Sequence, residues 1–244
     1  MIHGITFATD NMSKSLEKCA MSLRHHGCAT VDIFSPNHSQ LFFLEKYNRE
    51  TMEQERGAGY WLWKPWIINH TLLFTEIGDY IVYADAGVEV INNLNFIIDR
   101  MGDQDVWLFG NKWAHIDWCK ADVIKKIIGL PYQNISTYKQ AQASVIIVRN
   151  TPTARAFIKE WLLWCQMPGL IDDSPSKTPN WSTFQEHRHD QAILTTLAIR
   201  DNIPLHWWPA SYNNGSFAYP KDGYETDKYP VLFNHHRKRN NEYV

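Results

Sequence analysis

The sequence lacks several features that mark common functional classes. It has no apolar run as long as a membrane span, and its first fifteen residues carry neither a basic segment nor a long apolar one. We therefore expect no transmembrane helix and no signal peptide. The four cysteines form no C-x-x-C pair, which indicates reduced thiols and a cytoplasmic protein. The 24 basic and 26 acidic residues nearly balance, so nucleic acid is not expected as a partner.

Several signature motifs are also missing. No G-x-G-x-x-G follows the first predicted strand, which argues against a dinucleotide-binding protein, and no H-E-x-x-H is present. The chain shows no internal repeat, no low-complexity tract and no clear domain boundary, so its 244 residues predict a single domain. Aromatic residues are abundant, with eleven each of Trp, Tyr and Phe. Core packing explains most of them, although sugar-binding sites also use flat aromatic faces.

Apolar patterns predict an α/β fold. Residues 5–8 and 30–34 are typical of strands, and a helix capped by Ser13 and stopped by Gly27 lies between them. Such a unit implies a mostly parallel central sheet flanked by helices. Further strands are predicted at residues 80–84, 106–110, 144–148, 205–208 and 231–234. Further helices are predicted at residues 41–55, from Pro65, at 120–129, after Thr151 and from Asp190.

The stretch that organises the chain runs from Gly78 to Val90. Its apolar strand ends at Asp85, which is followed by Ala86 and Gly87. A carboxylate at the carboxyl end of a buried strand lies where open α/β sheets bind ligands, and glycine allows close approach. The alternative interpretation is an ordinary turn, because Asp-Ala-Gly is common turn chemistry.

Lys64 precedes Pro65, which fits the first turn of a buried helix. A lysine at a helix N-terminus is opposed by the helix dipole unless an anion lies between them, so the pair predicts a phosphate site. The alternative is a lysine that extends to solvent over Trp61 and Trp63.

Polar residues also gather at the start of the helix after residue 186. Capping alone explains Asp190, but it does not explain His187, His189 and Gln191 beside it. The segment from residue 167 to 183 is long for a loop and is typical of a lid or a binding loop.

Two further segments have candidate binding residues. Thr9 and Asp10 follow the first strand, where they either meet a nucleotide or form a polar turn. Near the end, His235 and His236 stand beside the basic residues 237–239. This segment either closes over a metal-bound diphosphate or is a solvated basic tail.

Three segments resemble one family when taken in order. They are GAGYWLWKP at residues 57–65, GDYIVYADAG at 78–87 and HRHDQAIL at 187–194. Together they are similar to GT-A-fold glycosyltransferases that use nucleotide-diphosphate sugars, in particular small cytosolic members from bacteria and large DNA viruses. The resemblance implies one GT-A domain, with a nucleotide-binding half over about residues 1–110 and an acceptor half over 111–244. It also implies a nucleotide-diphosphate sugar donor, with a UDP-sugar favoured, and a glycan or glycoprotein acceptor.

The resemblance assigns a metal-binding role to Asp85. It matches the first aspartate of an Asp-x-Asp motif, which holds Mn²⁺ or Mg²⁺ against the donor phosphates. Gly87 replaces the second aspartate, which is a departure from the family pattern. The metal would then be held by Asp85 with His235 or His236, or with Glu89, or only weakly.

Other roles follow from the same resemblance. Lys64 corresponds to a basic residue near the donor phosphates or sugar, and Ala86, Gly87 and His189 line the donor site. Asp190 and Gln191 correspond to a catalytic pair that faces the transferred sugar. Asp190 would orient donor hydroxyls or deprotonate the acceptor. Thr9 and Asp10 would line the nucleotide. Apart from the resemblance, we take residues 167–183 and 217–229 as candidate acceptor surfaces.

Two functions of other classes compete with this one. A metal-dependent hydrolase of a phosphoester or nucleotide sugar would use His187, His189, Asp190 and Asp85 as ligands. A non-catalytic carbohydrate-binding module would use the tryptophans, but it would need neither Asp85 nor Lys64.

Overall fold

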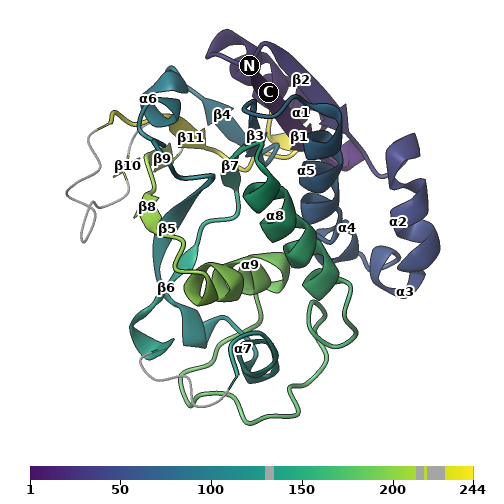
Figure 1. The fold of residues 1–244 in the computed structure, drawn as a ribbon. Coiled ribbons are helices and arrows are strands. Elements are labelled where there is room, and N and C mark those ends of the chain that lie inside the picture. Colours follow the sequence, from purple (N-terminus) through teal and green to yellow (C-terminus); the bar gives the residue numbers. More distant parts are fainter. Residues whose placement is uncertain (130–134, 213–216, 219–228, 244) are drawn as a thin grey trace.

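A computed structural model describes residues 1–129, 135–212, 217–218 and 229–243 (Figure 1). Its larger sheet has seven strands in the order β2-β1-β3-β7-β5-β6, with β8 paired to β5. These strands are β1 (Ile2–Phe7), β2 (Thr30–Phe34), β3 (Tyr80–Ala84), β5 (Val106–Ala114), β6 (Lys139–Ala141), β7 (Val145–Arg149) and β8 (Leu205–Trp207). Strands from both parts of the sequence therefore share one sheet, in keeping with the expected single domain.

The predicted mostly parallel α/β sheet is confirmed. Strand β1 runs parallel to β2 and β3, and β8 runs parallel to β5. Strand β7 is antiparallel to both β3 and β5, so those two strands share one direction. Only β7 and β6 oppose the rest, so the carboxyl ends of β1, β2 and β3 meet at one edge of the sheet.

A second, four-stranded sheet has the order β10-β9-β11-β4. Its strands are β4 (Val88–Val90), β9 (Ala210–Tyr212), β10 (Phe217–Ala218) and β11 (Phe233–His235). Strand β4, which was not predicted because it is only three residues long, begins three positions after Asp85. It pairs antiparallel with β11, and this pairing places the late histidine segment beside the residues that follow the β3 strand.

Helices cover the sheet (Figure 1). They are α1 (Ser13–His25), α2 (Phe42–Tyr47), α3 (Arg49–Met52), α4 (Gly57–Tyr60), α5 (Trp63–Phe74), α6 (Asn95–Ile98), α7 (Ala121–Ile127), α8 (Pro152–Cys165) and α9 (His189–Arg200). Across the described ranges, none of these helices has the length and apolar character needed to cross a membrane.

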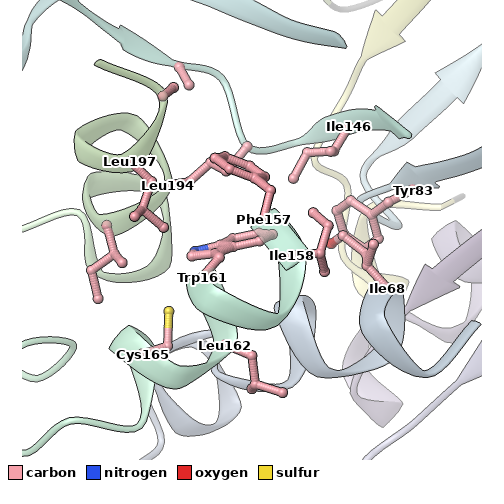
Figure 2. Packing of buried hydrophobic residues seen from close by; sticks show 14 of the residues in the cluster. Ile68, Tyr83, Ile146, Phe157, Ile158, Trp161, Leu162, Cys165, Leu194 and Leu197 are labelled. Carbon is pink, nitrogen blue, oxygen red and sulfur yellow. The ribbon is translucent and has the colours of Figure 1, made fainter. Parts of the chain in front are cut away.

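The main core lies between α5, α8, α9 and the sheet (Figure 2). Phe157 of α8 lies between Leu194 of α9 and Ile146 of β7, and the Tyr83 ring of β3 packs near Ile68 of α5. The predicted cap of α8 is confirmed, because Thr151 accepts a hydrogen bond from the Ala154 N–H and Pro152 begins the helix. This packing fixes the starts of α5 and α9 relative to the end of β3.

Two local predictions were wrong. The helix expected over residues 41–55 is instead the pair α2 and α3, separated at Asn48, whose side chain donates back to the Leu44 carbonyl at 3.0 Å. Such a local bond competes with continuation of the helix. Ser13 does not cap α1. It is the first helical residue, and its hydroxyl accepts a hydrogen bond from Asn240 at 2.9 Å.

Candidate active site

Lys64 lies at the centre of the candidate site. Its Nζ is 3.4 Å from Oδ1 of Asp85 and 3.3 Å from Oδ2 of Asp190, and it donates a hydrogen bond to the Ala143 carbonyl at 3.1 Å. The side chain is only 3 % exposed, so the alternative in which it extends to solvent is wrong. Four segments that are distant in sequence therefore meet at one ammonium group.

Local structure explains how these groups converge. Asp85 follows β3 at the carboxyl edge of the sheet, and Lys64 and Asp190 stand in the first turns of α5 and α9. The start of α9 is held by Trp161, whose Nε1 donates to the Asp190 carbonyl at 3.0 Å. A cation in the first turn of a helix is unfavourable alone, and here two carboxylates compensate it.

The charges of Lys64 and Asp190 shift each other's pKa. Burial lowers the pKa of Lys64, but the charges of Asp190 and Asp85 outweigh it and the net shift is upward. Burial raises the pKa of Asp190 to about 6, against the opposing effect of Lys64. Oδ2 of Asp190 accepts no hydrogen bond within the described chain, because the contact with Lys64 is an ion pair without hydrogen-bond geometry. Asp190 is thus a buried carboxylate with one oxygen, Oδ2, free to accept a hydrogen bond and with a pKa of about 6.

Tyr83 is a site residue that sequence reasoning missed. Its buried hydroxyl donates to Oδ1 of Asp85. Burial is the main reason that its pKa lies well above the usual value, and the neighbouring Asp85 charge adds to the shift. The signal was present in the sequence, because residues two apart on a strand point to the same face.

Gln191 is connected to the segment before β7. Its Nε2 donates to Oε1 of Gln140 at 2.6 Å, and its Oε1 accepts from the Ala143 N–H at 3.4 Å. Lys64, the partner of Asp190, binds the carbonyl of the same Ala143, so Gln191 and Lys64 meet at the backbone of one residue. Gln140, which the sequence did not single out, fixes the orientation of the Gln191 amide.

The two histidines before Asp190 have separate partners. His187 is buried and uses both ring nitrogens, one with the Lys120 N–H at 3.3 Å and the other with the Leu170 carbonyl at 2.7 Å. Nε2 of His189 lies 3.0 Å from Oδ1 of Asp173, and burial lowers its pKa to about 4. His187 and His189 therefore do not form the metal-ligand set that a hydrolase would need.

The His189 ring stacks on Tyr60, which belongs to a left-handed backbone turn. Five consecutive residues from Gly57 to Trp61 have positive φ values between 50° and 94°, which is a single left-handed turn. Such a turn is costly for residues other than glycine, and strain of this kind concentrates at functional sites. It places the Tyr60 ring 5.0 Å from the His189 ring, nearly parallel to it, and His189 itself has a φ of 47°.

The predicted loop over residues 167–183 carries no helix or strand, as expected, but it is tied down at several points. Nζ of Lys120 contacts five oxygen atoms of residues 169, 172 and 174 at 2.7 to 3.4 Å. Arg56 then bridges Asp173 and Glu186 at 3.3 and 3.0 Å. The loop thus forms a fixed wall beside His189. Most of the other candidate acceptor surface, 217–229, lies outside the described residues.

The structure separates the two late histidines. Burial is the main cause that lowers the pKa of His235 to about 3. The negative charge of Asp85 acts against this shift. His236 instead feels Lys18 and Glu89, and its Nδ1 accepts from the Lys238 N–H at 3.1 Å. Among the charges that shift the pKa of each histidine, Asp85 therefore acts on His235, whereas Lys18 and Glu89 act on His236.

The predicted metal ligands do not form one group. In the part of the chain that the structure describes, no three His, Cys, Asp or Glu side chains gather as a metal site requires. Glu89 is engaged by Lys18 at 2.8 Å and by Asn234 at 3.2 Å. Ala86 is buried, and Gly87 packs against Arg237.

Thr9 and Asp10 follow β1, which is parallel to β3. They therefore lie at the same edge of the sheet as Asp85. The Thr9 hydroxyl donates to Asn11 at 2.7 Å, and the Asp10 carbonyl accepts from Asn240 at 2.8 Å. These contacts form a polar turn against the C-terminal segment.

No family model and no curated protein matches the chain. Solved structures do match. The apo structure of WbbM, a bifunctional glycosyltransferase, has a TM-score of 0.55 at 13 % identity over 97 % of this chain, which spans 46 % of WbbM. The fold is that of GT-A glycosyltransferases.

Two structures of LgtC support the same fold over a larger share of the matched protein. An active-site mutant of LgtC has a TM-score of 0.54 at 13 % identity. The galactosyltransferase LgtC in complex with donor and acceptor sugar analogs has a TM-score of 0.50 at 14 % identity. Both cover 97 % of this chain and 87 % of theirs. At this identity the likeness shows the GT-A-like fold and leaves the chemistry to be argued from the site.

Proposed function

We propose that the protein is a glycosyltransferase that moves a sugar from a nucleotide-diphosphate sugar to a hydroxyl group of an acceptor. One observation carries the proposal. Lys64 joins Asp85 and Asp190 at the carboxyl edge of the sheet, and Gln191 stands beside them. A donor diphosphate needs a polar site at this edge, and a transferred sugar needs a carboxylate and an amide that face its hydroxyls.

The reaction breaks the bond between the sugar anomeric carbon and the terminal phosphate oxygen, which leaves with the electron pair. A new bond forms between the anomeric carbon and the acceptor oxygen, and the acceptor proton is taken by a base. Asp190 suits two roles, because its free Oδ2 can accept a hydrogen bond from a donor hydroxyl or take that proton. Its pKa of about 6 leaves it mainly ionised at neutral pH. Gln191, oriented by Gln140, positions the sugar.

In this proposal Lys64 acts indirectly, through its contacts with the carboxylates of Asp85 and Asp190. Its three closest partners are Asp85, Asp190 and the Ala143 carbonyl, so its charge is used inside the protein. It fixes the geometry of Asp190 and limits the rise in the pKa of that residue.

The sequence resemblance is the basis for the substrates in this proposal. LgtC has been solved with donor and acceptor sugar analogs, which supports a sugar donor here. The sequence resemblance favours a nucleotide-diphosphate sugar, and a UDP-sugar in particular, as that donor. Thr9 and Asp10 would line the nucleotide within the N-terminal half. A glycan or glycoprotein would be the acceptor, bound by the C-terminal half near the wall formed by the loop before α9. We place the protein in the cytoplasm, because its four cysteines are all free thiols.

The side chains at the site do not fit a divalent metal well. Gly87 supplies no second carboxylate, and His236 is turned toward Glu89 and Lys18. Asp85 is engaged by Lys64 and Tyr83, and Nε2 of His235 already accepts a hydrogen bond from Arg237. The predicted Mn²⁺ or Mg²⁺ therefore has no assembled ligand set among the described residues, and no step above depends on it.

The test is a donor panel. Purified protein is incubated with uridine, guanosine and thymidine diphosphate sugars, and unfolding is followed. A ligand at about a hundred times its Kd adds roughly 2.7 kcal/mol to the stability of the folded state. The stabilising donor is then offered with mixed glycan acceptors. We expect nucleoside diphosphate release that depends on the acceptor, and its loss in Asp190→Asn with donor binding retained.

Other outcomes would favour the competing functions. Release of free sugar from the donor without any acceptor would indicate a hydrolase. Glycan binding by a protein that no nucleotide sugar stabilises would indicate a carbohydrate-binding module. In either case the transferase proposal would be rejected.

A further inference from the structure

The place of the missing second aspartate is filled by backbone from the end of the chain. A Cβ at position 87 would lie 2.9 Å from Cα of Arg237 and 3.2 Å from its backbone nitrogen. The Gly87 carbonyl also accepts hydrogen bonds from the N–H groups of His236 and Arg237, at 2.9 and 3.1 Å. Glycine is therefore needed here for close packing, and an aspartate would not fit without moving the C-terminal segment.

Arg237 itself has an unusual backbone conformation. Its φ is 54°, a left-handed value that arginine rarely adopts. The Arg237 N–H donates to the Gly87 carbonyl, and Nε of its side chain donates to Nε2 of His235 at 3.2 Å. Within the described residues this is the only hydrogen bond of the guanidinium, so both Nη groups are free, and the residue is exposed.

We propose that Arg237 binds the diphosphate of the donor directly, supported by His235, and that this contact replaces the metal held by an Asp-x-Asp pair. The proposal rests on the proposed function. A guanidinium suits a diphosphate, because its fixed fork of donors matches two phosphate oxygens and it stays charged at every relevant pH.

The net charge of the site supports replacement of the metal by Arg237. A divalent cation on two aspartates adds no net charge to its site, because the carboxylates cancel it. Here one carboxylate is absent at position 87, Asp85 is neutralised in part by Lys64, and Arg237 brings one positive charge to the same place. The diphosphate therefore meets a positive group without a metal.

The experiment measures binding of UDP, GDP and dTDP by calorimetry, in EDTA and again with Mn²⁺. We expect one of them to bind in EDTA, with a Kd that changes less than threefold on addition of Mn²⁺. Arg237→Gln should weaken that binding at least tenfold, and Arg237→Lys should give an intermediate value. Arg239→Gln is the matched control, since Arg239 is exposed and its bond to Glu242 uses the backbone nitrogen. It should bind as the wild type does.

Gly87→Ala provides a second variant that leaves the arginine in place. Its Cβ would push the Arg237 backbone away, so binding should fall as in Arg237→Gln while circular dichroism stays native.

Each contrary result has a distinct meaning. Binding that is lost in EDTA, or that survives Arg237→Gln unchanged, overturns this inference and leaves the proposed function intact. A folded wild-type protein that binds none of the three diphosphates, with or without Mn²⁺, overturns the proposed function and this inference with it.

Discussion

Nζ of Lys64 lies 3.3 Å from Oδ2 of Asp190, and both side chains are almost completely buried. The pair links the first turn of α5 to the first turn of α9, and Asp85 at the end of β3 completes it. Buried ion pairs are weak evidence of net stability, because desolvation offsets the attraction. Their geometry is nonetheless demanding, and removal of one partner leaves an unpaired buried charge.

We therefore expect Lys64→Met to be strongly destabilising. It leaves Asp85 and Asp190 close together without a cation, and breaking a buried pair in this way costs about 3–5 kcal/mol. Urea unfolding at pH 7 measures the loss. The double variant with Asp190→Asn removes the uncompensated buried carboxylate and should recover a large part of that stability. If the two changes were simply additive, the pair would not be coupled as the structure indicates.

Protonation of Asp190 should cause the transfer rate to fall at acidic pH. Burial raises the pKa of this carboxyl from 3.8 to about 6, so it gains a proton as the pH falls through 6. The transfer rate should therefore fall about tenfold per pH unit below that value, as expected for a base that must be ionised. Initial rates between pH 4.5 and 8 measure it. A profile that is flat across pH 6 would exclude Asp190 as the base.

The same pKa predicts an opposite trend in stability. The folded pKa of Asp190 is raised, so between about pH 4 and 6 the folded protein holds a proton that the unfolded chain has released. The stabilisation from this group is present at low pH and is lost as the pH rises through about 6. Relative to Asp190→Asn, wild-type stability should decline by up to about 3 kcal/mol over that window. Unfolding curves of both proteins at several pH values give the comparison, and parallel pH dependences would contradict it.

Local pattern was enough to predict part of this structure. The strand from Tyr80 to Ala84 and the capped helix after Thr151 were predicted because apolar spacing and Pro at a helix start act within a few residues. The resemblance marked Lys64, Asp85 and Asp190, but it did not show that they touch. Lys64 also binds the Ala143 carbonyl, 79 positions away, and a backbone carbonyl leaves no mark in a sequence.

Other features were hidden for different physical reasons. The left-handed turn from residue 57 to 61 includes Ala58, Tyr60 and Trp61, none of which prefers that conformation. Tertiary packing therefore decides it. The role of Gly87 depends on the Arg237 backbone, which arrives through the pairing of β11 with β4. Both features are determined by contacts between distant segments and not by local preference.

Two glycines with nearly the same φ value allow the left-handed turn to be tested. Gly59 and Gly78 have φ values of 94° and 93°, so alanine at either position carries a similar strain of about 1–2 kcal/mol. A Cβ at Gly78 would meet nothing within 4 Å, whereas one at Gly59 would lie 2.9 Å from Met52. Gly59→Ala should therefore lose clearly more stability than Gly78→Ala. It should also reduce transfer, because the Tyr60 ring beside His189 would move. Equal losses in the two variants would show that packing at Gly59 is unimportant.

Lys120 should hold the wall beside the site in place. Its buried ammonium contacts oxygen atoms of residues 169, 172 and 174, and this segment carries Asp173 to His189. Lys120→Met removes this ammonium donor from the carbonyl groups of residues 169, 172 and 174, while Asp172 keeps hydrogen bonds from the N–H groups of Gly169 and Ser174. An unsatisfied group costs about 1–3 kcal/mol where it is buried. We expect trypsin to cleave the variant several times faster at Lys177 and Arg188, under conditions in which the wild type is resistant. Lys125→Met on α7 is the matched control, because Lys125 is exposed on the same helix and should change neither stability nor cleavage. If both variants were cleaved at the wild-type rate, the loop before α9 would have to be held by its other contacts, such as those of Asp122 with the N–H groups of residues 177 and 178.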